Sequence, residues 1–191
     1  CLNSSWRDRF FQVLRSLRDY SIDGVFLDGP TGIAGGCHCP ACRRQYREWF
    51  GRDMGDGAAG YDFTRRSKHA FLSESYRLFK QIKPGGLFYM NLPVRHPHSS
   101  GLEIRESLEW NDIVGTEGGF QFYSAPKYSW LWKPGFAARL IEGVAPQKPR
   151  VIFMAADQKN WTWYQHTPGE TALCIATSVA NGANVWYGLH N

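Results

Sequence analysis

Residues 24–30 have the sequence GVFLDGP, and this stretch decides the predicted fold. A short apolar run that starts at a glycine and stops at Gly-Pro is typical of a buried strand. Before it, Trp6, Phe10 and Leu14 recur at helical spacing and predict an amphipathic helix over about residues 4–20. A helix followed by a strand of this kind indicates an α/β fold.

The same alternation continues to the end of the chain. The further helices are expected at 43–50, 62–83, 136–144 and 167–180, and the further strands at 86–92, 113–117, 150–156 and 184–188. The segment Thr167-Pro-Gly-Glu170 has the pattern of a capping box with proline in the first turn, which marks a helix start. Five buried-type strands alternating with helices predict a parallel sheet with helices around it.

Such a sheet is either open or closed into a barrel. No glycine-rich phosphate loop follows any predicted strand, which argues against the open nucleotide-binding type. A full (β/α)₈ TIM barrel needs eight strands and usually about 250 residues. We therefore interpret residues 1–191 as a single, partial TIM-barrel domain, roughly strands 4 to 8, with a cysteine-rich loop at 36–43.

The composition narrows the classes of partner. The net charge is +5, but the basic residues are scattered over predicted helices, so no nucleic-acid partner is expected. No apolar run approaches the roughly 18–20 residues that span a bilayer, so no membrane partner is expected either. The 8 tryptophans, several of them in predicted loops, favour a carbohydrate ligand with flat apolar faces. The sequence is compatible with a homo-oligomer.

Acidic residues stand at three of the strand ends: Asp28, Glu117 and Asp157. In a barrel, chemical groups act from the carboxyl ends of the strands. Cleavage of a glycosidic bond needs two carboxyl groups, one as acid and one as nucleophile or base. We expect Asp28 as nucleophile and Glu117 as acid/base, with Asp157 in reserve. Alternatively, Asp28 caps a turn and Glu117 pairs with an arginine.

Polar and aromatic residues after the strands are the candidates for sugar binding. They are Asn91, His96, Trp130, Trp161 and Trp163. For each tryptophan, a place in the core is the competing interpretation, and a histidine here can equally bind metal or have no role.

Three cysteines, Cys37, Cys39 and Cys42, have a spacing that allows their thiolates to converge on one tetrahedral ion. A closed structural zinc site needs a fourth ligand, for which Cys1 and His38 are the candidates. The alternative is a reduced, metal-free cluster. Reduced cysteines favour a cytoplasmic location over a secreted one.

The run DGVFLDGP followed by CHCPACRRQYREWFG resembles the barrel of glycoside hydrolase family 42 β-galactosidases and of their hypothetical glycosyl hydrolase relatives. The resemblance implies a TIM barrel, a glycosidase, and zinc ligands at Cys37, Cys39 and Cys42, with Cys1 in the place of the family's first cysteine. In family 42 the corresponding strand ends in Asn-Glu, whereas here it ends in Asp28-Gly29. The piece FLDG is similar to the nucleophile strand of α-L-fucosidases, which favours Asp28 as nucleophile and a galactoside- or fucoside-like substrate.

Two alternatives remain. A non-catalytic carbohydrate-binding barrel would bind sugar without turnover. A zinc-knuckle module that binds nucleic acid would show steeply salt-dependent affinity for DNA or RNA.

Overall fold

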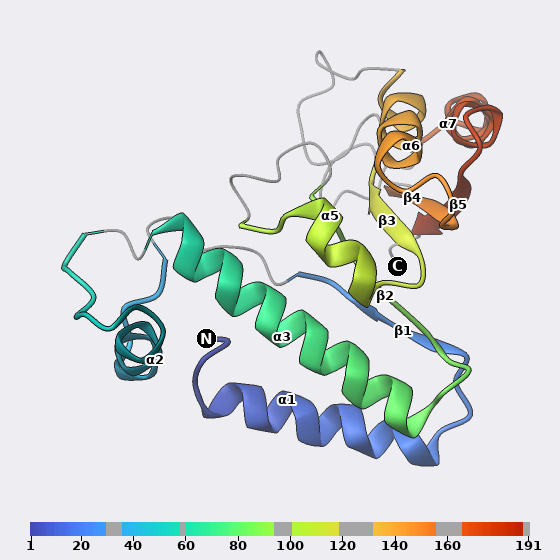
Figure 1. Cartoon of the computed structure of the whole chain (residues 1–191). Coiled ribbons are helices and arrows are strands. Elements are labelled where there is room, and N and C mark those ends of the chain that lie inside the picture. The colour runs from blue at the N-terminus through green and yellow to red at the C-terminus, as the bar shows by residue number, and fades with distance from the viewer. Residues whose placement is uncertain (30–35, 58–59, 94–100, 119–131, 156–165, 189–191) are drawn as a thin grey trace. The chain divides into compact units, whose positions relative to one another are not determined.

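The computed structural model describes residues 1–29, 36–57, 60–93, 101–118, 132–155 and 166–188 (Figure 1). The chain divides into two compact units. The first consists of Cys1–Tyr89 and His96–Asn111, and the second of Met90–Arg95 and Asp112–Asn191.

Strand β1 (Gly24–Leu27) of the first unit is hydrogen-bonded to β2 (Leu87–Met90). The Leu87 N–H donates to the Asp23 carbonyl at 2.8 Å. The strands approach so closely that a Cβ on Gly24 would lie 2.4 Å from the Leu87 carbonyl oxygen, so a side chain at this position would force the strands apart. The four residues of β1 are partly buried, less deeply than the sequence predicted.

The described part of the first unit contains helices that pack partly through aromatic side chains. They are α1 (Ser5–Ser16), α2 (Pro40–Phe50), α3 (Tyr61–Ile82) and α5 (Ile104–Ser107), with 3₁₀ turns at Leu17–Asp19 and Leu108–Trp110. Figure 1 shows α1 and α3 side by side, and Phe11 of α1 stacks on Phe71 of α3 at 5.8 Å between ring centroids. Both rings are at least 96% buried, at 4% and 2% exposure. Burial of two such rings supplies much of the free energy that holds α1 against α3.

The second unit contains three parallel strands in the order β3 (Val114–Glu117), β4 (Arg150–Ala155) and β5 (Asn184–Gly188). Asn91 forms a parallel bridge to Gly115 of β3. The helices α6 (Lys133–Val144) and α7 (Pro168–Ala180) pack on these strands and on each other. The core between them consists of fully buried apolar side chains: Val114, Ile141, Ile152 and Met154.

The predicted α/β class and the parallel pairing of the last three strands are confirmed. The capping box is also present, with both Thr167–Glu170 hydrogen bonds formed. Helix α2 starts at Pro40 rather than at residue 43, because proline fits the first turn, where its missing N–H has no partner to lose. Helix α5 was not predicted, since one turn is too short to show a periodic pattern. The numbering of the strands as barrel strands 4 to 8 stays a prediction.

No helix among the described residues is both long enough and apolar enough to cross a bilayer.

Candidate functional site

Glu117 is the last residue of β3, and its carboxylate is held by a side chain from the neighbouring segment. Asn91 Nδ2 donates to Glu117 Oε1 at 2.9 Å. Two hydrogen bonds between the same segments hold this contact in place: the Leu92 N–H donates to the Gly115 carbonyl at 3.0 Å, and the Thr116 hydroxyl donates to the Leu92 carbonyl at 2.7 Å. The structure thus brings together two of the residues singled out in the sequence, at the carboxyl end of a parallel strand.

Asp28 directly follows β1 and is exposed. It lines a cavity of about 380 Å³ in the first unit. Gly29 after it has φ of 94°, a left-handed conformation that favours glycine and turns the chain sharply behind the carboxylate. Burial, followed by the negative charge of Asp28, raises the pKa of Tyr89 on β2 to about 12. The carboxylate is therefore accessible from a cavity, as chemistry on a bound ligand requires.

The remaining site candidates lie outside the described residues. These are Asp157, His96, Trp130, Trp161 and Trp163. Their proposed roles stay predictions.

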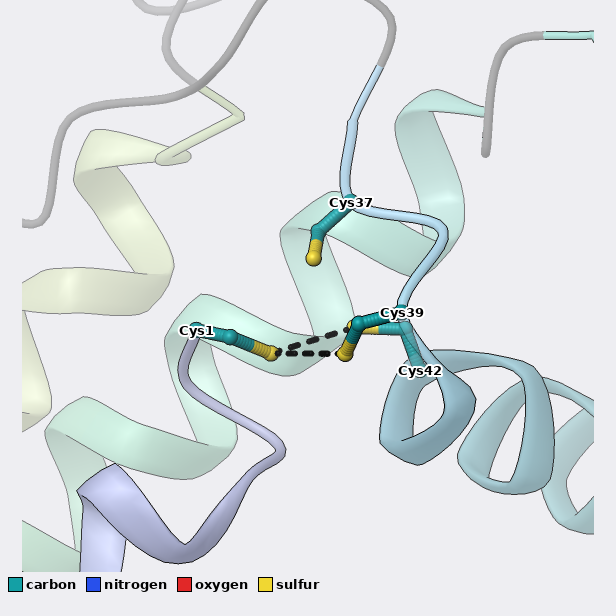
Figure 2. A group of neighbouring side chains, drawn as sticks. All are labelled: Cys1, Cys37, Cys39 and Cys42. Atoms are coloured by element: carbon teal, nitrogen blue, oxygen red, sulfur yellow. Dashed lines mark hydrogen bonds between the residues drawn. The ribbon is translucent and has the colours of Figure 1, made fainter.

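The four cysteines of the predicted metal site converge (Figure 2). The sulfurs of Cys1, Cys37, Cys39 and Cys42 all lie within 4.8 Å of one another. Cys1 Sγ is 3.5 Å from Cys39 Sγ and 3.4 Å from Cys42 Sγ. Of the two candidates for the fourth ligand, Cys1 joins the group; among the described residues, the group contains no histidine.

Local structure places these thiols. Cys39 is the N-cap of α2, and Cys42 lies in its first turn at 1% exposure. Burial raises the pKa of Cys39, but hydrogen bonds from the Cys42 and Ala41 backbone and from neighbouring thiols outweigh it, so the net shift is downward. For Cys42, burial dominates and raises the pKa to about 12. A bound cation would favour the thiolate form against this effect of burial.

The geometry fits a tetrahedral thiolate site. With Zn–S bonds of about 2.3 Å, the sulfurs of a tetrahedron lie about 3.8 Å apart, and the sulfur pairs here are within 4.8 Å. A set of four thiolates suits a soft or borderline ion such as zinc. Asn3 Nδ2 donates to Cys42 Sγ at 3.4 Å and to Ser67 Oγ of α3 at 3.0 Å, so it ties the cluster to that helix. Outer contacts of this kind orient metal ligands.

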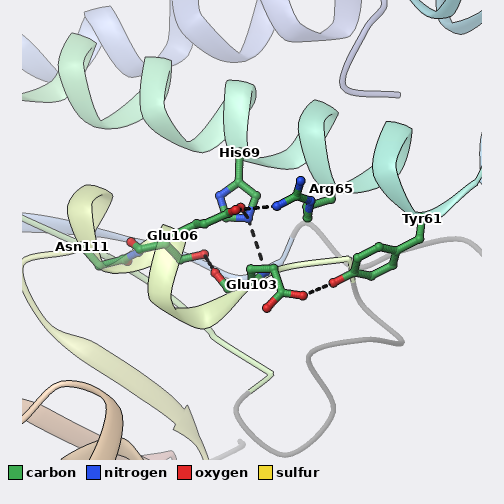
Figure 3. Close-up of polar contacts among 7 residues, drawn as sticks. Tyr61, Arg65, His69, Glu103, Glu106 and Asn111 are labelled. Atoms are coloured by element: carbon green, nitrogen blue, oxygen red, sulfur yellow. Dashed lines mark hydrogen bonds and ion pairs between the residues drawn. The ribbon is translucent and has the colours of Figure 1, made fainter. Parts of the chain in front are cut away.

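A second polar cluster, which the sequence did not reveal, joins α3 to α5 (Figure 3). Arg65 forms an ion pair with Glu106, and His69 Nε2 lies 3.1 Å from the other oxygen of this carboxylate. The Glu103 N–H also donates to His69 Nε2, at 3.3 Å, and the Tyr61 hydroxyl donates to the Glu103 carboxylate. Burial lowers the pKa of His69, which favours the neutral ring that accepts this bond. Since the Arg65–Glu106 ion pair and the hydrogen bonds of Glu103 link the two helices, the cluster stabilises the first unit.

The only sequence signal for this cluster was the spacing of Arg65 and His69, four residues apart on one face of a helix. Trp6 was also missed as a site residue. The sequence placed it in the apolar stripe of its helix, but it is 49% exposed and lines the Asp28 cavity.

Searches of the sequence against protein-family profiles and against curated proteins give no match. Solved structures do match. Two β-galactosidases, from Rahnella sp. R3 and from Bacillus circulans sp. alkalophilus, are similar with TM-scores of 0.71 and 0.72, each at 15% identity. The glycoside hydrolase domain of PgaB (BpsB) from Bordetella bronchiseptica has a TM-score of 0.68 at 14% identity.

The matches cover 99%, 100% and 100% of this chain, in the same order. The chain spans about a third of each β-galactosidase, 34% in both cases, and 58% of the PgaB chain. At these identities the likeness is one of fold. The class that the fold defines is therefore the α/β, TIM-barrel type found in glycoside hydrolases, of which this chain is equivalent to a part.

Proposed function

We propose that this chain is the carboxylate-bearing part of a glycoside hydrolase. Asp28 acts as nucleophile, Glu117 acts as acid/base, and Asn91 positions the Glu117 carboxylate. The observation that carries the proposal is the position of the two acidic residues. Each stands at the carboxyl end of a strand, in a fold shared with three glycoside hydrolases.

The environments of the two carboxylates suit these roles. Glu117 is partly buried and accepts a hydrogen bond from the Asn91 amide, which orients its carboxylate for proton transfer. Asp28 is exposed to its cavity, where an anion can attack a sugar carbon or stabilise positive charge on it. The similar β-galactosidases and the fucosidase-like FLDG sequence together favour galactoside- or fucoside-like substrates.

The proposal includes a structural zinc ion held by Cys1, Cys37, Cys39 and Cys42. When bound, it would supply a cross-link and no chemistry of the reaction, since four thiolates complete a tetrahedral shell. Its support is the convergence of the sulfurs together with the hydrogen bond from Asn3 to Cys42.

The test is hydrolysis of aryl galactosides and aryl fucosides by the protein and its variants. We expect Asp28→Asn and Glu117→Gln each to lower kcat by about 1,000-fold or more while the thermal unfolding temperature is retained, because each removes a group that acts on the reacting bond. Turnover that is unchanged in both variants would refute the assignment.

Each of the two strands offers a matched control substitution at its opposite end. Asp23 and Asp112 precede β1 and β3, so they stand at the opposite ends of the strands from Asp28 and Glu117. Asp23→Asn and Asp112→Asn remove the same charge there and should leave kcat unchanged. A protein that binds sugars tightly without any turnover would instead be a carbohydrate-binding barrel.

A further inference from the structure

Trp6 lines the Asp28 cavity, and two aromatic rings pack against its indole. Its ring stacks on Phe10 at 5.6 Å between centroids and lies 5.9 Å from Phe71 of α3. About half of the side chain remains exposed, at 49%, although α1 is otherwise packed against α3. An indole held by two rings loses little entropy when a ligand stacks on it, so it is preorganised for binding.

The rest of the cavity supplies polar groups around this ring. Asn3, Ser67 and Lys68 line it together with Asp28. Asn3 is fixed by its bonds to Ser67 and Cys42, and Ser67 and Lys68 are consecutive residues of α3. A flat apolar face surrounded by hydroxyl, amide and ammonium groups matches a sugar ring, which has an apolar face and a rim of hydroxyls. The volume of about 380 Å³ lies at the lower end of the range for ligand pockets, which suits a single ring.

The charge of the cavity wall selects among sugars. Cys1, Cys37 and Cys42 form part of the wall. A divalent cation bound by the four thiolates would carry a net negative charge, and the Asp28 carboxylate adds another. Lys68 is the one cationic side chain among the described residues that line the cavity. With the ion bound, the described residues of the wall would carry a net negative charge and would repel a sugar carboxylate.

We infer that this cavity is the subsite for one uncharged sugar ring, with Trp6 as its stacking platform. That the bound ring is part of the glycoside that is cleaved rests on the proposed function. That a sugar ring binds in this cavity does not depend on the proposed function.

The experiment compares Trp6→Leu and Trp6→Phe with the matched control Tyr20→Leu in the zinc-loaded protein. Tyr20 is 62% exposed and ends the same helical segment, roughly 20 Å along the helix from Trp6. Leucine keeps an apolar contact with Phe10 but has no flat face, and phenylalanine restores one. Thermal unfolding of each variant identifies any loss of fold.

Affinity for galactose and for fucose is measured by calorimetry in an Asp28→Asn background, and kcat/KM is measured with Asp28 intact. We expect Trp6→Leu to weaken affinity for the preferred sugar about five- to tenfold, the loss expected for one aromatic contact, with partial recovery in Trp6→Phe and no change in Tyr20→Leu. Unchanged affinity in a folded Trp6→Leu protein would overturn the inference. Asp28→Asn would still abolish turnover in that case, so the proposed function would stand.

The converse outcome is distinguishable as well. Sugar binding that depends on Trp6 in a protein without turnover would support the subsite and refute the hydrolase. The charge argument has its own test, in which galactose is compared with galacturonate. The uronate should bind at least about tenfold more weakly at pH 7. Equal or tighter binding of the uronate would overturn the assignment to an uncharged sugar.

Discussion

Replacement of Cys42 by serine is the sharpest test of the cysteine cluster. Structural zinc sites contribute about 10–16 kcal/mol through four ligands, so one ligand accounts for about 3 kcal/mol. Loss of this amount weakens zinc binding roughly 100-fold. Because zinc binds the folded protein, the free energy of unfolding in saturating zinc falls by the same amount. A further cost of about 1–3 kcal/mol follows from burial of a hydroxyl at a position that is 1% exposed.

Cys174 provides the control that separates these two costs. It is 2% exposed and, unlike Cys42, does not belong to the four-cysteine cluster. Cys174→Ser should therefore show the hydroxyl cost alone. Zinc affinity is measured by competition with a coloured chelator, and stability by urea unfolding with and without zinc. The reasoning is refuted if Cys42→Ser binds zinc as tightly as the wild type, or if chelation leaves wild-type unfolding unchanged.

Three further substitutions test single contacts or the burial of a single side chain. Asn91→Ala removes the bond to Glu117 and should lower kcat about tenfold or more with little change in KM, seen in steady-state kinetics with an aryl glycoside. Gly24→Ala places a Cβ 2.4 Å from the Leu87 carbonyl oxygen and should cost about 1–3 kcal/mol in urea unfolding. Burial lowers the pKa of Lys68 to about 8, so protonation opposes folding, and wild-type stability should rise between about pH 8 and pH 10.5. Below pH 8 the Lys68→Met protein should be more stable than the wild type by on the order of 2–3 kcal/mol. Urea unfolding should show that this difference in stability becomes smaller as the pH rises to 10.5. A difference that does not change with pH would contradict the prediction.

Much of the fold was predictable because its signals are local. The helical spacing of Phe10 and Leu14, the capping box at Thr167 and the apolar run of β4 each lie within a few residues. The spacing of Cys37, Cys39 and Cys42 likewise predicted that their thiols meet.

The remaining features depend on contacts between distant segments. Spacing alone left Cys1 and His38 as candidates for the fourth ligand; the family resemblance favoured Cys1, and the fold brings Cys1 to the cluster. The sequence did not show that Trp6 is exposed, because one apolar stripe of a helix can contain both core residues and residues that face a ligand. Glu106 pairs with Arg65, which lies 41 residues earlier in the sequence, and no local sequence pattern indicates a contact over that separation.

The contact between Cys1 and Cys42 joins residues 41 positions apart. A metal ion at this junction closes the chain into a ring that contains α1, β1 and Asp28. Because the ion would bind the folded chain and leave on unfolding, it would stabilise this ring through its binding free energy. The ion would thus act as a reversible cross-link, and a change in its supply would change the stability of the segment that contains Asp28.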